Sequence, residues 1–273
     1  MNHEVPPKAL TIAGSDTSGG AGLEADLKTF QEFGVYGMGA VTCIVAQNPA
    51  ADWRHDVYPI GLDVVEAQLA TILDGIGVDA AKTGMLATCE LIDLVVGTLR
   101  RKQVRNLVVD PVMACKGASA PLNPEVADAL RDKLMPLSAC ITPNLYEAGI
   151  LSGVGEIRTV EGMAEAASRL CRAGAKSVLV KGGSKLVGAT TAIDVFCDGG
   201  VPERLEGELI PGAYTHGAGC TISAAIAANL AKGKSVREAI HAAREFEAAA
   251  LRRSFPLNRW VGPLRHDAWR LGR

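Results

Sequence analysis

Short apolar segments alternate with amphipathic segments along most of the chain, and this alternation limits the fold more than any other feature. Strands that alternate with helices form a mainly parallel sheet with helices on both faces. No long polar linker interrupts the pattern, so we predict an α/β fold with a single domain over residues 1–273. The expected strands lie at 10–13, 41–46, 78–82, 106–110, 140–142 and 177–181, and the expected helices at 23–33, 62–73, 91–101, 145–151, 218–232 and 236–253.

Turn and cap residues refine this prediction. Asp198-Gly199-Gly200 predicts the turn of a β-hairpin between segments 191–195 and 205–210. Asn123-Pro124 has the order of a helix cap and first turn. Capping boxes are expected at Asp63 with Glu66, and at Ser235 with Glu238.

Composition excludes several classes of protein. Hydrophobic residues make up 48% of the 273 residues, enough for a large core, and the net charge of −2 predicts neither a nucleic-acid nor a membrane partner. The N-terminus lacks the apolar region of a signal peptide, and no apolar run is long enough to span a membrane. The seven cysteines are scattered and include no CxxC pair, which favours reduced thiols in the cytoplasm.

Glycine-rich or polar segments follow several of the expected strands. In open α/β sheets, ligands bind beyond the carboxyl ends of the strands. The candidate site therefore draws on residues 14–22, 82–85, 110–117, 144–147 and 181–183.

Gly217 and Gly219 precede a helix of small residues, and such a helix start can bind an anion through its N–H groups. Cys220 lies at the same terminus, where the pKa of a thiol tends to fall. The alternative is a glycine turn before a tightly packed helix. Two familiar nucleotide motifs are absent, because Ala228 replaces a required P-loop glycine and Ile222 replaces the third dinucleotide-fold glycine.

Asp110 ends one strand and Glu147 follows another, and two carboxylates at one sheet edge suit a hydrated Mg²⁺. The alternative for Asn144 and Glu147 is helix capping. The small residues from Cys115 to Ser119 suit a mobile lid or an ordinary surface loop. His55 lies in a polar stretch and can equally be a surface histidine.

The motifs GSDTSGGAGLEADLKTF, AAKTGML, VVDPVMACKG, ITPNLYEA, VLVKGG and YTHGAGCTISAAI resemble those of the hydroxymethylpyrimidine (phosphate) kinases of thiamine synthesis. Their order matches this ribokinase-like family over roughly residues 8 to 266. The resemblance implies a three-layer α/β/α sandwich with a small lid. It also implies ATP and Mg²⁺ as cofactors, allows a monovalent cation, and suggests a homodimer.

Three features resemble a subgroup, the pyridoxal kinases of Gram-positive bacteria that carry two functional cysteines. They are Cys115 in the lid, Ala218 in the glycine-rich segment, and the stretches 53–60 and 254–262. The implied activity is ATP-dependent phosphorylation of the hydroxymethyl group of pyridoxal, pyridoxine or pyridoxamine, together with hydroxymethylpyrimidine. Gln47 resembles the pyrimidine kinases and supports this dual use.

The resemblance also implies roles for individual residues. Cys220 would accept the hydroxymethyl proton, Cys115 would add to the aldehyde of pyridoxal, and His55 would assist at the substrate. The anion hole would comprise Gly217, Ala218, Gly219 and Cys220, and the metal site would comprise Glu147 and Asp110. The substrate pocket would be lined by Gly14, Asp16, Gly22, Val45, Gln47, Met85, Val112 and His216. The ATP site would include Asn144, Lys181, Gly183, Thr215, Gly217 and Gly219.

Two alternatives remain at this level. One is a dedicated thiamine-pathway kinase that phosphorylates hydroxymethylpyrimidine and then its monophosphate, which Gln47 favours and Cys115 opposes. The other is a non-catalytic vitamin-binding protein, which the intact segment from Gly217 to Cys220 opposes.

Overall fold

A computed structural model describes residues 5–113, 124–186 and 190–272. One sheet runs through the middle of this part of the chain, in the order β3-β2-β1-β4-β5-β6-β7-β8-β9. Its strands are β1 (Lys8–Asp16), β2 (Tyr36–Asn48), β3 (Arg54–Pro59), β4 (Ala80–Thr83), β5 (Leu107–Val109), β6 (Cys140–Ile141), β7 (Val178–Gly183), β8 (Ala192–Cys197) and β9 (Glu203–Gly207).

The central strands are parallel. The pairs from β2 through β1, β4, β5 and β6 to β7 all run in the same direction, whereas β3 and β8 pair antiparallel with their neighbours. The carboxyl ends of six adjacent strands therefore meet at one edge of the sheet. This confirms the mainly parallel sheet and the predicted hairpin, whose strands are displaced by one to three residues from the expected positions.

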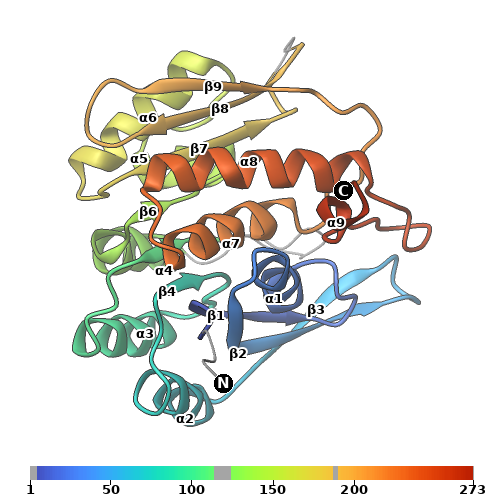
Figure 1. The fold of residues 1–273 in the computed structure, drawn as a ribbon. Helices are drawn as coiled ribbons and strands as arrows, with labels where there is room; N and C mark the ends of the chain where they lie inside the picture. Colours follow the sequence, from blue (N-terminus) through green and yellow to red (C-terminus); the bar gives the residue numbers. More distant parts are fainter. Residues whose placement is uncertain (1–4, 114–123, 187–189, 273) are drawn as a thin grey trace.

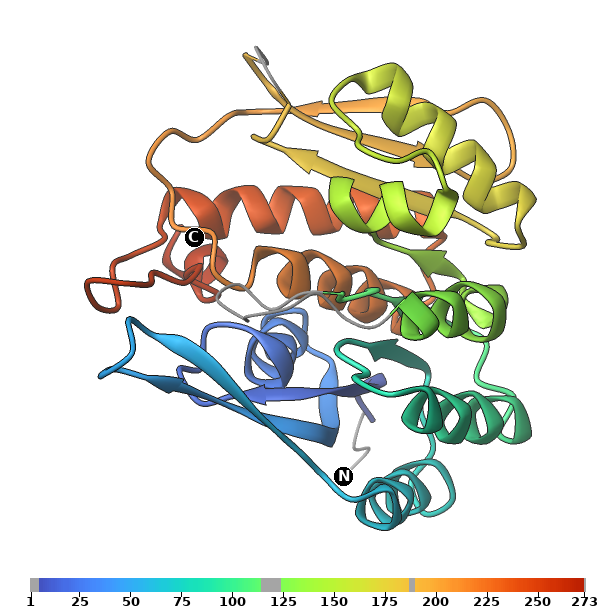
Figure 2. The ribbon, with the colours of Figure 1, turned by 180° about the vertical axis from the view of Figure 1, so that it is seen from behind.

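Helices cover both faces of the sheet (Figures 1 and 2). One face packs against α2, α3, α4, α5 and α6, and the other against α1, α7 and α8, with α9 beside α8. The helical segments are α1 (Gly22–Glu32), α2 (Leu62–Leu73), α3 (Cys89–Arg101), α4 (Pro124–Ala129), the π-turn η1 (Leu130–Leu134), the 3₁₀ turn η2 (Met135–Leu137), α5 (Leu145–Ser152), α6 (Val160–Arg172), α7 (Ala218–Ala231), α8 (Val236–Arg252) and α9 (Ala268–Leu271).

Alternate residues of each strand supply the two cores. In β1, Leu10 and Ile12 enter the core under α2 and α3, whereas Ala9 enters the core under α1 and α7. Small side chains make up most of helix α7, including the buried Ala224, Ala225, Ala227 and Ala228, so its backbone lies close to the sheet. The arrangement confirms the expected three-layer ribokinase-like sandwich.

The local predictions met with mixed success. The capping box of Ser235 with Glu238 is present, but α2 has Gly61 as its N-cap and no side-chain cap, so the box predicted at Asp63 and Glu66 is wrong. Helix α6 and strand β3 were not predicted. In the described part of the chain, no helix is both long and apolar enough to cross a bilayer.

Candidate active site

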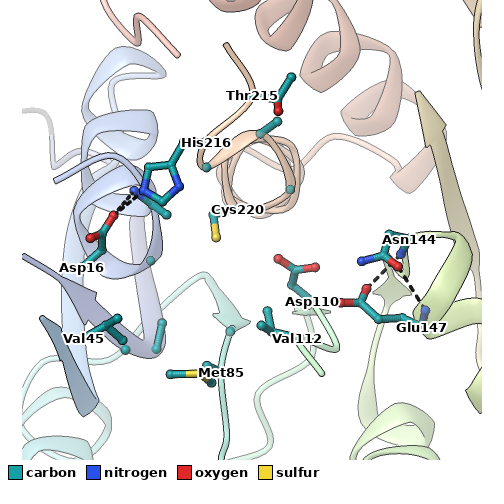
Figure 3. A pocket seen from close by; sticks show the side chains of 18 of the residues that line it. Asp16, Val45, Met85, Asp110, Val112, Asn144, Glu147, Thr215, His216 and Cys220 are labelled. Carbon is teal, nitrogen blue, oxygen red and sulfur yellow. Dashed lines mark hydrogen bonds and ion pairs between the residues drawn. The ribbon is translucent and has the colours of Figure 1, made fainter. Parts of the chain in front are cut away.

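A cavity of about 390 Å³ opens at the carboxyl edge of the parallel strands (Figure 3). Most of the predicted site residues line it. Two predicted residues are not among the lining residues. Gly183 ends β7 outside the lining, and Cys115 lies outside the described residues, as does the rest of the expected lid. The predicted residues in the lining are Gly14, Asp16, Gly22, Val45, Gln47, His55, Met85, Asp110, Val112, Asn144, Glu147, Lys181, Thr215, His216, Gly217, Ala218, Gly219 and Cys220.

The start of α7 forms the centre of the cavity wall. Gly217 is its N-cap and has a φ of +83°, a left-handed conformation that glycine adopts without strain. A Cβ atom on Gly217 would lie 1.9 Å from the carbonyl oxygen of Gly20, so the two loops touch through bare backbone. The N–H group of Ala218 bonds the carbonyl of Thr215 at 3.3 Å. The positive end of the dipole of this 14-residue helix makes its start suited to a phosphoryl group.

Cys220 points from the first turn of α7 into the cavity (Figure 3). Burial raises the pKa of its thiol to about 12, against the lowering effect of the Lys82 ammonium group. The carboxylates of Asp26 and Asp110 add to the increase. The expectation of a lowered pKa at this helix terminus is therefore wrong for the protein without ligands, because desolvation outweighs the helix dipole.

Asp16 connects the residues on one side of the cavity. Its carboxylate accepts hydrogen bonds from Gln47 Nε2 at 2.5 Å and from the backbone N–H of Ala21 at 2.8 Å. His216 Nε2 lies 2.8 Å from the same carboxylate, and Ser18 donates from both its backbone and its hydroxyl. Burial raises the pKa of Asp16, but its hydrogen bonds and the charge of His216 more than offset this and hold the pKa well below its usual range.

Gln47 and His55 take defined orientations on this side. Because a carboxylate can only accept, the amide nitrogen of Gln47 must face Asp16, and its carbonyl oxygen is left for another donor. His55 comes from the unpredicted strand β3, and its ring centroid lies 6.4 Å from that of His216. Burial lowers the pKa of His55, and the neighbouring His216 lowers it further, so neutral imidazole is favoured.

The opposite side of the cavity carries Asn144, Glu147 and Asp110 (Figure 3). Lys181 also lines the cavity, beside Asp110. Asn144 and Glu147 form a complete capping box at the start of α5, which confirms the helix-capping interpretation. The Lys181 ammonium group lies 2.9 Å from Asp110. A Cβ on Gly219 would lie 3.2 Å from the same ammonium, so this glycine leaves room for Lys181 to reach the helix start.

The carboxylates of Asp110 and Glu147 suit a metal ion that keeps several bound waters, rather than one bound entirely by protein side chains. Burial raises the pKa of Glu147 to about 7; Lys181 opposes this and Asp110 adds to it. Nearby like charges of this kind favour a cation between them. No cluster of three or more His, Cys, Asp or Glu side chains suited to a metal occurs among the described residues, so substrate phosphates and water would have to complete the coordination.

Some lining residues had no individual role predicted, although most of them lie in the segments expected to form the site. Lys82 is fully buried in β4, and a lysine within an apolar strand is a signal that the sequence does contain. Tyr146 is 51% exposed at the start of α5 and carries no distinguishing sequence signal. Ala21 and Gly84 also lie within the expected segments, whereas Ala13 and Lys185 lie outside them.

The sheet order, the two helical layers and a glycine-rich helix start at the strand ends are those of a ribokinase-like α/β fold. Residues 16–265 match the family described as phosphomethylpyrimidine kinase. The chain belongs to this family.

Relatives and solved structures extend this assignment. The chain is 58% identical over 264 residues to the pyridoxine kinase of Bacillus subtilis, with 97% of both sequences covered. A crystal structure of an ADP complex of Bacillus subtilis pyridoxal kinase matches with a TM-score of 0.94 at 58% identity, covering 98% of this chain and 100% of that one. Pyridoxal kinase from Staphylococcus aureus, in complex with AMP-PCP and pyridoxal, matches with a TM-score of 0.92 at 44% identity and covers 98% and 96% of the two chains.

Proposed function

We propose that the protein transfers the γ-phosphoryl group of ATP to the hydroxymethyl group of pyridoxal, pyridoxine or pyridoxamine. One observation carries the proposal: a single cavity joins the start of α7 to a substrate-sized pocket on one side and to Lys181 and Asn144 on the other. The likeness to a kinase that binds AMP-PCP and pyridoxal supports the same two ligands here.

Phosphoryl transfer depends mainly on positioning and on charge stabilisation. The N–H groups that begin α7, from Gly217 to Cys220, would bind the transferring group. Lys181 would place a positive charge beside it, because Gly219 lets its ammonium approach the helix. Asn144 and Thr215 would border the nucleotide, and Gly183 would contribute backbone beyond the lining.

Glu147 and Asp110 would hold Mg²⁺, which neutralises charge on the phosphate oxygens when it is bound. Asp110 is held by Lys181 and by the hydroxyl of Ser223 at 3.3 Å. Glu147 is held by the backbone N–H of Asn144 at 2.9 Å. These contacts hold both carboxylates at the cavity wall.

The ring of the substrate would lie among Gly14, Gly22, Val45, Met85 and Val112, with Asp16, Gln47, His55 and His216 on its polar side. The carbonyl oxygen of Gln47 would accept from an exocyclic amino group, which hydroxymethylpyrimidine carries and pyridoxal does not. This observation favours hydroxymethylpyrimidine as a second substrate, and the family match agrees with it.

Cys220 would accept the hydroxymethyl proton as a thiolate, and Cys115 would form a hemithioacetal with the aldehyde of pyridoxal. The raised pKa of Cys220 means that few molecules hold the thiolate at neutral pH. The rate of the chemical step should therefore depend on the charges that surround this sulfur. We further propose a cytoplasmic homodimer that uses a monovalent cation.

A kinase assay with pyridoxal, pyridoxine, hydroxymethylpyrimidine and its monophosphate, run side by side with ATP and Mg²⁺, tests the proposal. We expect turnover of the first three. Robust formation of a diphosphate from the monophosphate, with poor turnover of pyridoxal, would instead establish a dedicated thiamine-pathway kinase. Absence of turnover with all four would favour a vitamin-binding protein without kinase activity.

A further inference from the structure

A lysine lies in the middle of the sheet beneath the candidate active site. Lys82 is 0% exposed, and so is its partner Asp26 on α1. The ammonium nitrogen lies 2.8 and 3.0 Å from the two carboxylate oxygens of Asp26. The hydroxyl of Thr11 on β1 donates to the same carboxylate at 2.6 Å, so three elements fix this one ion pair.

The folded state alone does not explain this pair. Removing two charges from water is costly, and a buried pair adds little stability over apolar side chains of the same volume. Its location is informative, because Lys82 lines the cavity that also contains Cys220. A Cβ on Gly84 would lie 3.3 Å from the ammonium nitrogen of Lys82, so a bare backbone leaves space for this group at the cavity floor.

Four charged groups surround the sulfur of Cys220. Helix α7 packs directly on β4 and β5, which carry Lys82 and lead into Asp110. Asp26 on α1 and Lys181 on β7 also act on the sulfur through their charges. Lys181 is paired with Asp110 at 2.9 Å and Lys82 with Asp26 at 2.8 Å, so both cations are held in place. Of the four groups, Lys82 has the largest charge effect on the thiol, and this effect favours the thiolate.

We propose that Lys82 is a positioning residue that stabilises the thiolate of Cys220, and that Asp26 and Thr11 hold its ammonium group in place while limiting the strength of this effect. The inference rests on the proposed function, in which Cys220 accepts the substrate proton. Lys82 would act on the substrate only through the sulfur of Cys220 and would not need to contact the substrate itself.

A double variant tests the charge effect of Lys82 without leaving a buried charge unpaired. Asp26→Asn alone would leave the buried ammonium group of Lys82 without its partner and lower the pKa of that group, so it does not isolate the effect of the cation. Lys82→Met alone would leave Asp26 buried without its cation, so the double variant Lys82→Met/Asp26→Asn is used to remove the cation without stranding the carboxylate. An opposite charge within about 4–6 Å shifts a pKa by about 1–3 units.

The first measurement is the alkylation of Cys220 by iodoacetamide as a function of pH, followed by peptide mass spectrometry. Cys140 on β6 is buried in the core that α7 covers, so its alkylation reports unfolding in the same samples. Relative to the parent protein at pH 8, we expect alkylation of Cys220 at least about tenfold slower in the double variant. An unchanged pH dependence of Cys220 alkylation in the double variant, with Cys140 protected, would overturn the proposal.

The second measurement is kcat against pH with pyridoxine as the substrate. We expect the rising limb, which reports deprotonation of the base, to move to higher pH in the double variant. A purely structural role would instead lower kcat equally at every pH and would contradict the inference. Shifted alkylation with an unshifted kcat profile would uphold the coupling of Lys82 to the thiol and refute the assignment of Cys220 as the proton acceptor, so the two failures are distinguishable.

Discussion

Replacing Gly217 by alanine should disrupt both the fold and the anion site. At a φ of +83°, alanine is disfavoured by about 1–2 kcal/mol. Its Cβ would lie 1.9 Å from the carbonyl oxygen of Gly20, a backbone atom that can only move with its loop. Forcing such a shift costs about 1–3 kcal/mol more. The sum of about 2–5 kcal/mol corresponds to a melting temperature lower by about 5–15 °C for a chain of this size.

Gly219→Ala is the matched control, two residues further into the same helix. Its Cβ would meet only the flexible end of Lys181, at 3.2 Å, and alanine favours a helix over glycine by about 1 kcal/mol. We expect normal or slightly higher stability but a kcat/KM for ATP reduced about tenfold, because a displaced charge beside the phosphoryl group would lose about 1.4 kcal/mol of transition-state stabilisation. Urea unfolding and steady-state kinetics measure both effects. Equal stability of the two variants would refute the reasoning from the left-handed backbone of Gly217.

Three further predictions concern the cavity walls. With pyridoxine, kcat/KM should rise as the pH increases from 7 to 9, because the fraction of Cys220 thiolate grows below its pKa of about 12; a Cys220→Asp variant, ionised throughout this range, should give a flat profile, and a flat profile for the unaltered protein would argue against the thiolate. Gln47→Met should lower kcat/KM for hydroxymethylpyrimidine by about tenfold or more relative to pyridoxal, since a hydrogen-bond acceptor is lost; a constant ratio in competition assays would exclude this role. Trp260 stacks on Trp53 with ring centroids 5.1 Å apart, so Trp260→Ala should loosen the hairpin that carries His55 and raise the KM for pyridoxine several-fold; steady-state kinetics would measure the change, and an unaltered KM would contradict it.

Elements with strong periodicity could be predicted closely from the sequence. Helix α2 begins and ends at the residues expected from its apolar spacing, Leu62 and Leu73. Strand β3 was missed because most of its residues are exposed at the edge of the sheet, where burial does not impose an apolar pattern. The capping box expected at Asp63 and Glu66 failed because the turn at Gly61 starts the helix before either side chain can cap it.

Most lining residues of the candidate site were also predictable, for a topological reason. Parallel strands bring their carboxyl ends to one edge, so the segments that follow them must meet there. The glycine-rich segments around Gly14 and Gly217 therefore face each other although they lie far apart in the sequence. Sequence motifs indicated which segments form the cavity, and the sheet order determined that they form one cavity.

The sequence by itself determined the alternation of strands and helices, the positions of the glycines and the two sulfurs assigned to chemistry. Only the tertiary structure decided the electrostatic state of Cys220. A helix terminus alone would lower its pKa, but burial, Asp26 and Asp110 raise it and Lys82 opposes them. Lys82 and Asp26 are 56 residues apart, and their contact arises from packing α1 on the sheet. Charge effects act through distances in space, which local sequence patterns do not contain.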